Sequence, residues 1–215
     1  MLRPLAAFSL AALLAACSTP SAPGRVDNRD SDRNGDTRAH VRIAEDGRGY
    51  LAMPDRVAWL QTDPRWAKHR LGRSSDTMGS DGCLVTAVAM AIGNLGITAD
   101  PAQLNKRLTE ANAFTPNGWL VWSGVEVATE GRARAVYHND VSPSLIRSCM
   151  AQGQYPLVRF ILPNGRSHWA MIVAESPEGY RMRDPLRKSA KPLIFPRGAE
   201  AFKSLRCVGP GERTA

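Results

Sequence analysis

The pattern of hydrophobic and polar positions divides the chain at about residue 56. Residues 5–16 form a short apolar run, and the following segment is rich in Ser, Pro, Gly, Asp and Arg but almost lacks large apolar side chains. Such a composition is typical of a solvated linker. From Val57 onward, apolar and aromatic residues recur between turn signals. We therefore predict one folded domain over residues 56–215, preceded by a tether over residues 17–55.

Helical spacing and capping signals are concentrated in the first half of the domain. Apolar residues between positions 84 and 95 recur at helical spacing, and Gly96 follows where a C-terminal cap belongs. Asp100-Pro101 and Ser142-Pro143 each combine a capping side chain with proline at the first helical position. These patterns predict helices over residues 84–95, 102–111, 119–129 and 143–152.

The period changes to that of strands in the second half. Two β-rich runs, residues 156–162 and 167–174, flank the turn signal Pro163-Asn164-Gly165-Arg166 and predict a hairpin. Residues 179–183 and 192–195 are further short strands. Because the helices come early and the antiparallel strands late, the pattern predicts an α+β domain.

The charge of the chain is basic but not concentrated. The 215 residues carry 28 Lys and Arg against 20 Asp and Glu, a net charge of +8. The arginines are scattered, and no basic run is interleaved with aromatic residues as a nucleic-acid surface requires. We expect no nucleic-acid partner, and interpret the charge as a general attraction to anionic surfaces.

The N-terminal apolar run is too short to be a permanent membrane span. Its end, Leu14-Ala15-Ala16-Cys17, resembles the lipobox of bacterial lipoproteins. The resemblance implies a signal peptide over residues 1–16, lipidation of Cys17, and a membrane anchor at the start of the mature chain. Ser18 after that cysteine implies sorting to the outer membrane, with the domain facing the periplasm. The alternative is an ordinary secretory signal that contains a chance cysteine.

Three cysteines remain after Cys17, in a compartment that permits disulfides. Cys149 lies in a predicted helix and Cys207 near the C-terminus, where a crosslink would be useful. A Cys149–Cys207 disulfide is one hypothesis, and two separate free thiols is the other. The odd number leaves at least one thiol unpaired within the chain, and Cys83 is the candidate.

Cys83 begins the predicted apolar helix, where unpaired backbone N–H groups and the helix dipole favour a thiolate. Gly82 before it leaves room for the backbone of a substrate. A thiol nucleophile needs a base, and His168 lies at the start of an apolar strand. Asp184 ends the next strand, so its carboxylate is expected beside that imidazole. The remaining histidines lie in polar segments: His40, His69 and His138.

Several short motifs together resemble the peptidase C39-like branch of the papain-like cysteine peptidase superfamily. The resemblance implies a papain-like α+β fold, in which N-terminal helices present the nucleophile at a helix N-terminus and pack on a C-terminal antiparallel sheet. It implies Cys83 as nucleophile, His168 as base and Asp184 as its orienting residue, with Gln61 in the oxyanion hole and no metal or cofactor. The motifs are Gln61-Thr62-Asp63-Pro64-Arg65-Trp66-Ala67, Leu71-Gly72, Met78-Gly79, Gly82-Cys83-Leu84-Val85-Thr86-Ala87, Ser167-His168-Trp169-Ala170 and Asp184-Pro185.

The chain departs from the family pattern at two places. Many relatives have Gly-Cys-Gly-Pro at the nucleophile, where this chain has Gly82-Cys83-Leu84-Val85. Gln61 also lies farther upstream of the cysteine than the papain pattern places it, so the backbone N–H of Cys83 is an alternative oxyanion donor.

The expected function is that of a membrane-anchored cysteine peptidase or amidase. Its triad would cleave an amide bond of a peptide, a protein or a peptidoglycan stem through a thioester. Two alternatives stay open. One is a non-catalytic binding or scaffold lipoprotein with the same fold. The other is a peptidoglycan hydrolase of the NlpC/P60 type, although the usual Asp-Cys-Ser-Gly context of that type is missing.

Overall fold

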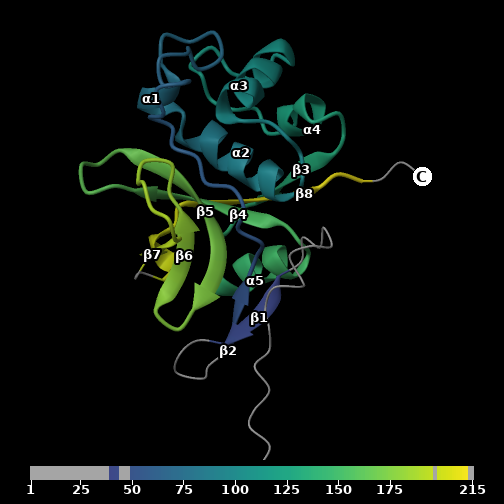
Figure 1. The fold of residues 1–215 in the computed structure, drawn as a ribbon, viewed down its shortest axis with the longest axis vertical. Coiled ribbons are helices and arrows are strands. Elements are labelled where there is room, and N and C mark those ends of the chain that lie inside the picture. The colour runs from purple at the N-terminus through teal and green to yellow at the C-terminus, as the bar shows by residue number, and fades with distance from the viewer. Residues whose placement is uncertain (1–38, 44–48, 196–197, 213–215) are drawn as a thin grey trace, which may run out of the picture.

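The fold is described from a computed structural model that covers residues 39–43, 49–195 and 198–212. The predicted signal peptide (residues 1–16) and the lipidation site Cys17 lie outside the described residues. Figure 1 shows one sheet with a group of helices on one side of it.

The sheet contains eight strands, and every pairing between them is antiparallel. Six strands follow the order β1-β2-β5-β4-β8-β3, and β6 and β7 branch from β5. The strands are β1 (His40–Ile43), β2 (Gly49–Ala52), β3 (Ala133–His138), β4 (Tyr155–Ile161), β5 (Ser167–Ser176), β6 (Gly179–Arg183), β7 (Leu193–Phe195) and β8 (Ser204–Pro210).

Strand β5 is the branch point of the sheet. Its first half pairs with β4, its second half pairs with β6, and its Ala174 and Glu175 also pair with β2. A bulge between Ile172 and Ala174 shifts the register to β6. Bulges bend a strand and increase its twist, so β5 carries the sheet from one set of partners to the next.

Short helices occupy the segments between the strands. They are α1 (Met78–Asp81), α2 (Cys83–Asn94), α3 (Pro101–Glu110), α4 (Gly124–Ala128) and α5 (Pro143–Ala151), with a 3-10 turn η2 at Ala199–Ala201. Asp100 accepts a hydrogen bond from the Gln103 N–H and Ser142 accepts one from the Leu145 N–H, which confirms both predicted helix starts.

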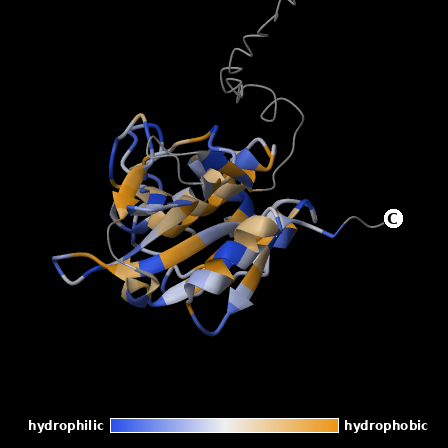
Figure 2. Cartoon of the chain, turned by 90° about the horizontal axis from the view of Figure 1, so that it is seen from below, coloured by the Kyte–Doolittle hydropathy of each residue, from blue (hydrophilic) through white to orange (hydrophobic). Residues whose placement is uncertain are grey.

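Helix α2 is the central helix of the molecule. It packs against β5, β8 and β4, and its residues from Val85 to Ile92 are all buried. Figure 2 shows hydrophobic residues along the helices and strands and hydrophilic residues in the connecting loops. The apolar run after Cys83 therefore anchors the start of α2 to the sheet.

The predicted layout of the fold is wrong. We expected a papain-like α+β domain in which N-terminal helices, with the nucleophile at a helix N-terminus, pack on a C-terminal sheet. Instead, antiparallel sheet dominates and draws strands from both ends of the chain: β1 and β2 precede the helices, and β3 lies between α4 and α5. Local patterns did not reveal this because strand partners far apart in sequence leave no local signal.

The predicted boundary between tether and domain also needs correction. Residues 40–43 and 49–52 were assigned to the tether, yet they form β1 and β2, and Ala52 is buried. The predicted helix over residues 119–129 is shorter than expected, since only Gly124–Ala128 is helical. Strand β8 was not predicted, although it pairs with both β3 and β4.

Candidate active site

His168 and Asp184 meet where β5 begins and β6 ends. His168 is the second residue of β5, and Asp184 directly follows β6, its antiparallel neighbour. The His168 Nε2 lies 2.7 Å from the Asp184 Oδ1. The same Oδ1 accepts the Leu186 backbone N–H at 2.8 Å, which fixes the carboxylate in the Asp-Pro turn. The two side chains thus form the pair expected from neighbouring strand ends.

Cys83 is the first residue of α2, and its thiol lies close enough to the His168 imidazole to raise the pKa of that ring. The side chain is half-buried, and it is the one free cysteine among the residues that the structure describes. Because Asp184 holds the Nε2 of His168, the Nδ1 is the ring nitrogen left for the thiol. The imidazole and the carboxylate are thus in contact, and a free thiol lies near the imidazole.

The imidazole of His168 is strongly basic for a histidine. Burial lowers its pKa, but the hydrogen bond to Asp184 and the neighbouring Cys83 outweigh that effect and raise the pKa to about 9. A histidine with this pKa is an imidazolium at neutral pH. A positive charge beside a cysteine favours the thiolate over the thiol.

Aromatic packing holds the His168 ring in place. Phe160 is its direct partner across β4 and β5, with ring centroids 5.4 Å apart and planes at 89°. Phe160 in turn contacts Phe195 and Phe202. His168 is only 1% exposed, so the ring is shielded from solvent and its orientation is set by packing as well as by Asp184.

Gln61 links α1, the short helix before Cys83, to the Asp184 turn. Its backbone N–H donates to the carbonyl of Pro185 at 2.9 Å, and its Nε2 donates to the carbonyl of Gly79 at 2.8 Å. The residue is buried, and its Oε1 has no partner among the described residues. One N–H of the amide is left over, because an NH₂ group carries two donors. Gln61 thus lies between α1 and the Asp184 turn, although it is not among the residues that line the cavity of Cys83.

The structure changes the role predicted for Gly82. We expected this glycine to leave room for the backbone of a substrate. A Cβ at Gly82 would instead collide with the Met78 carbonyl oxygen, one turn earlier in α1. The glycine is required because α1 and α2 follow each other without a spacer, and the close contact is with the protein's own backbone.

Cys83 also lines an open cavity of about 540 Å³. Four aromatic side chains contribute to its walls: Phe114, Trp119, Trp122 and Trp169. Trp122 and Trp169 pack together with ring centroids 5.6 Å apart, and Trp119 is 72% exposed. The thiol therefore connects a buried imidazole to a cavity of a size that accepts a small molecule or a few peptide residues.

The cavity also contains two arginines that the sequence did not single out, Arg159 of β4 and Arg206 of β8. Neither lies in a motif. Strand register alone brings them together, because Arg159 pairs with Ser204 and Arg206 lies two residues further along the same strand face. Only the pairing of β4 with β8 could have revealed them.

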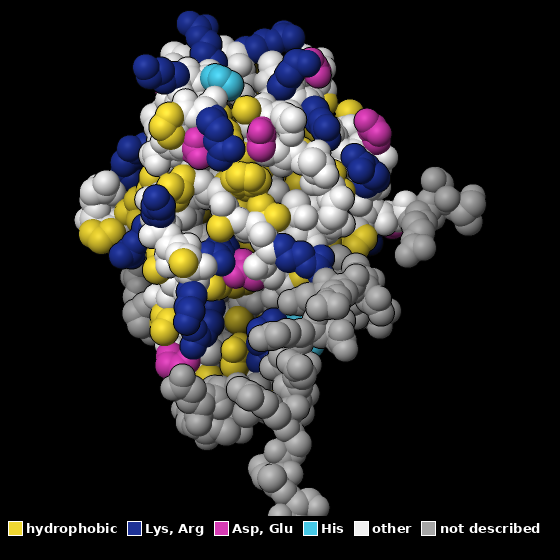
Figure 3. All heavy atoms as spheres, viewed as in Figure 1, with side chains coloured by type: hydrophobic (Ala, Val, Ile, Leu, Met, Phe, Trp, Pro, Cys, Tyr) yellow, Lys and Arg dark blue, Asp and Glu magenta, His cyan; other side chains and the backbone are white. Residues whose placement is uncertain are grey.

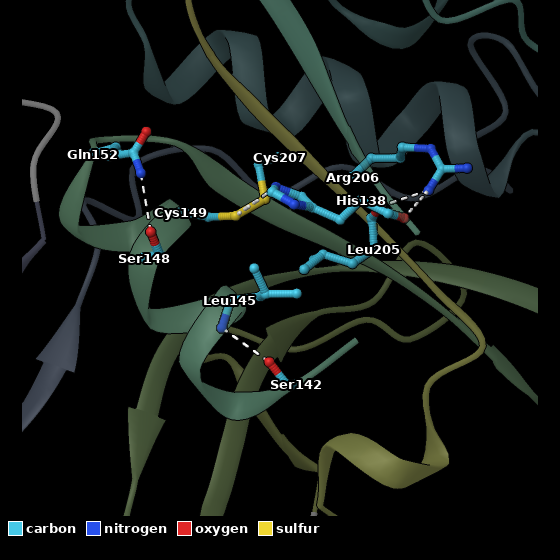
Figure 4. The surroundings of a disulfide bond; sticks show 9 residues. All are labelled: His138, Ser142, Leu145, Ser148, Cys149, Gln152, Leu205, Arg206 and Cys207. Carbon is cyan, nitrogen blue, oxygen red and sulfur yellow. Dashed lines mark hydrogen bonds between the residues drawn. A yellow bond between two sulfur atoms is a disulfide. The ribbon is translucent and has the colours of Figure 1, made fainter. Parts of the chain in front are cut away.

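A second site, away from Cys83, contains two cysteines and a histidine (Figure 4). Cys149 of α5 and Cys207 of β8 are joined by a disulfide, the pair named from the cysteine count. The His138 Nε2 lies 3.7 Å from the Cys149 Sγ. These three residues are the one group in the described part of the chain whose geometry could suit a metal ion. Both sulfurs are engaged in the disulfide, so no thiolate ligand is available there.

Comparisons with known proteins give little further information. No protein-family model and no curated protein sequence matches this chain. Among solved structures, a crystal structure from Bacillus anthracis, described as a candidate C39-like peptidase, is similar to 76% of this chain and 98% of its own chain. The sequence identity is 15% and the TM-score is 0.49.

Proposed function

We propose that the protein is a cysteine hydrolase that cleaves an amide bond by acyl transfer, as a peptidase or an amidase. The observation that supports this proposal is the connected set of Asp184, His168 and Cys83, in which the thiol lines a cavity. An anchored imidazole beside a free thiol is the arrangement that nucleophilic cysteine catalysis requires.

In the proposed cycle, Cys83 attacks as a thiolate and His168 holds the proton. With a pKa of about 9, His168 holds its proton at neutral pH, and Asp184 keeps that ring oriented through Nε2. The proton that matters for catalysis is the one on Nδ1, the ring nitrogen that does not contact Asp184. This nitrogen takes the thiol proton before the reaction and delivers it afterwards.

Acylation begins when the Cys83 thiolate attacks the carbonyl carbon of the substrate. A C–S bond forms, and the carbonyl π electrons move onto oxygen. As the oxyanion collapses, the C–N bond breaks, and the His168 Nδ1 proton goes to the leaving amine. The products of this half are a thioester on Cys83, a free amine and a neutral imidazole.

Two donors are positioned to hold the oxyanion. The backbone N–H of Cys83 lies at the first position of α2, where N–H groups have no acceptor within the helix. The second N–H of the Gln61 amide is the other, because the first is fixed on Gly79. Preorganised donors of this kind stabilise the transition state of acyl transfer.

Deacylation returns the enzyme to its starting state. Neutral His168 takes a proton from water, the hydroxide attacks the thioester carbon, and the C–S bond breaks to release a carboxylic acid and the thiolate. The imidazolium–thiolate pair is restored. Over the whole cycle the substrate amide and one water are consumed, and the three residues return to their starting state.

The test combines thiol labelling with turnover by the full chain. We expect an alkyne-tagged iodoacetamide to label Cys83 at neutral pH, and we expect cleavage in a fluorogenic peptide library or in purified peptidoglycan. Cys83→Ala should lose both while keeping the circular dichroism spectrum of the parent. Lys106→Ala, an exposed change on α3, should lose neither. Hydrolysis that persists in Cys83→Ala would overturn the proposal and favour another site.

A lipid anchor at Cys17 is a separate proposal that rests on the sequence alone. The motif Leu14-Ala15-Ala16-Cys17 supports it, and with it a location at the outer membrane, facing the periplasm. No helix in the described part of the chain is long and apolar enough to cross a membrane. We expect the N-terminal peptide of the mature protein to carry a diacylglycerol mass on Cys17, and Cys17→Ala to abolish that mass. An unmodified Cys17 would contradict the anchor.

A further inference from the structure

The cavity beside Cys83 contains positive charge that the protein does not neutralise. Arg159 and Arg206 both line the cavity and share one face of the sheet. Arg159 donates to two hydroxyl groups, Ser204 at 3.2 Å and Ser167 at 3.4 Å. Among the described residues, neither arginine forms an ion pair with a carboxylate. The floor of the cavity is therefore cationic.

Arg206 is the more informative of the two, because it is 93% buried. Its Nη1 donates to the carbonyls of His138 and Leu205, at 3.3 and 2.6 Å (Figure 4). The guanidinium stacks on Tyr137 at 3.3 Å from the ring centroid and lies 5.6 Å from that of Trp122. The residue is 7% exposed, and its Nε has no partner among the described residues. Burial without a counter-ion also lowers its pKa.

Three other arginines differ from Arg206 because each forms an ion pair with a carboxylate. Arg134 and Arg181 also have a buried, unpartnered Nε, but each forms an ion pair through another nitrogen, with Glu212 and with Glu178. Arg183, which is also buried, is held by both oxygens of Asp55. A buried charge with no anionic partner is costly, so the uncompensated guanidinium of Arg206 points to an anion supplied from outside.

The acidic residues of the cavity lie elsewhere on its wall. Asp76 and Asp81 are both exposed, and Asp81 is already paired with Arg166 at 3.0 Å. Trp122 and Trp169 line the cavity beside the arginines, since the Arg206 guanidinium lies 5.6 Å from the Trp122 ring and Trp169 pairs with Arg159 across β4 and β5. The cavity therefore combines positive charge, an apolar surface and a thiol, and an occupant should match all three.

We propose that Arg159 and Arg206 bind a carboxylate of the substrate, while Trp122 and Trp169 pack against its apolar part. The substrate class is thus a peptide-like acyl compound with a free carboxylate near the scissile bond. Arginine suits this task because its planar fork can present two N–H groups to one carboxylate. That the ligand is a substrate rests on the proposed function, whereas the carboxylate site itself does not.

The experiment measures binding without catalysis. The full chain carrying Cys83→Ala is titrated with N-acetylphenylalanine and with N-acetylphenylalaninamide, and shifts in ¹⁵N–¹H spectra give each Kd. A second pair, N-acetylglutamic acid α-amide and N-acetylglutamine α-amide, distinguishes a side-chain carboxylate from a C-terminal one. We expect the acid of at least one pair to bind about tenfold more tightly than its amide, because charge-assisted hydrogen bonds are lost in the amide.

Variants then assign the preference to the two arginines. Arg206→Lys and Arg159→Gln should each reduce the acid-to-amide preference to about twofold or less. Arg159 is half-buried and bonds only hydroxyl groups, so its variant keeps the test valid if Arg206→Lys does not fold. The control is Arg147→Gln, which removes a surface ion pair with Glu175 and should leave the preference unchanged.

The outcomes separate this inference from the proposed function. Equal affinity for acid and amide in both pairs would overturn the carboxylate site, and so would a preference that survives in the folded arginine variants. A clear preference in Cys83→Ala, combined with no hydrolysis by the parent protein, would uphold the site and refute the hydrolase. Hydrolysis of neutral and acidic substrates at the same kcat/KM, without any preference in binding, would refute the carboxylate site and uphold the hydrolase.

Discussion

The molecule places a histidine beside a cysteine sulfur twice, and the two places differ in what surrounds them. At the first, His168 is fixed by Asp184 and neighbours a free thiol at a helix start and a cavity. At the second, His138 lies 3.7 Å from Cys149, whose sulfur is already bonded to Cys207. The proposed catalytic role of the first site therefore does not follow from the pair of residue types alone. The difference is made by a carboxylate on the far ring nitrogen and by an unbonded sulfur.

The surroundings of the two sites also differ in charge. Figure 3 shows Lys and Arg side chains spread over the visible face without a single concentrated patch, as the sequence suggested. The uncompensated arginines of the cavity are thus a local feature. Arg206 belongs to both regions, since it precedes Cys207 in β8, donates to the His138 carbonyl and faces the cavity of Cys83.

The largest expected effect comes from replacing each of the two histidines in turn. His168→Gln should lower kcat/KM by roughly 10³-fold or more, because it removes the group that accepts and delivers the proton. His138→Gln should change kcat/KM by less than about twofold, since the polar contact of the His138 ring is with a disulfide sulfur. Steady-state kinetics on the same substrate checks both. Equal losses in the two variants would erase the distinction between the sites.

The second prediction concerns the disulfide. Replacing Cys149 and Cys207 together by Ala should lower the free energy of unfolding by up to about 4 kcal/mol, because the bond closes a long loop in the unfolded chain. Urea denaturation measures this loss. Iodoacetamide should still alkylate Cys83 at the parent rate. A large fall in that rate would show that the structural site supports the reactive one.

A smaller effect is expected at the carboxylate of the reactive site. Asp184→Asn should lower kcat/KM by roughly 10²-fold, because the amide holds the ring in place but stabilises the imidazolium less than a carboxylate does. The pKa of His168 should fall as well, and a ¹³C- or ¹⁵N-detected titration of the ring reports it. An unchanged pKa would show that Cys83 alone keeps the imidazole protonated.

The smallest and most gradual expected effect is a change of the melting temperature with pH. His168 has a folded pKa of about 9 against an ordinary value of 6.5, so its stabilising contribution is fully present below pH 6.5. That contribution is lost as the pH rises from 6.5 through about 9, and the melting temperature should fall over this window by roughly a few degrees. His168→Gln should flatten the curve. A melting temperature that rises over the same window would contradict the assigned shift.

Several features could be predicted from the sequence because their causes are local. The helix after Cys83, the caps at Asp100 and Ser142 and the hairpin of β4 and β5 depend on neighbouring residues, and the structure contains all of them. The contact of His168 with Asp184 followed from two adjacent strands. In each case the signal and the structure lie within a few residues of each other or one strand apart.

The remaining features depend on partners that lie far apart in the chain. The joining of β1 and β2 to β5, the pairing of β8 with β4 and the meeting of Arg159 with Arg206 have no local pattern, because strand register is set by packing over the whole sheet. The sequence by itself therefore determined the local elements and named the residues that we propose to be reactive. Only the tertiary structure decided that the thiol opens into an aromatic cavity with two unpaired arginines, because a buried charge has meaning only in relation to what packs around it.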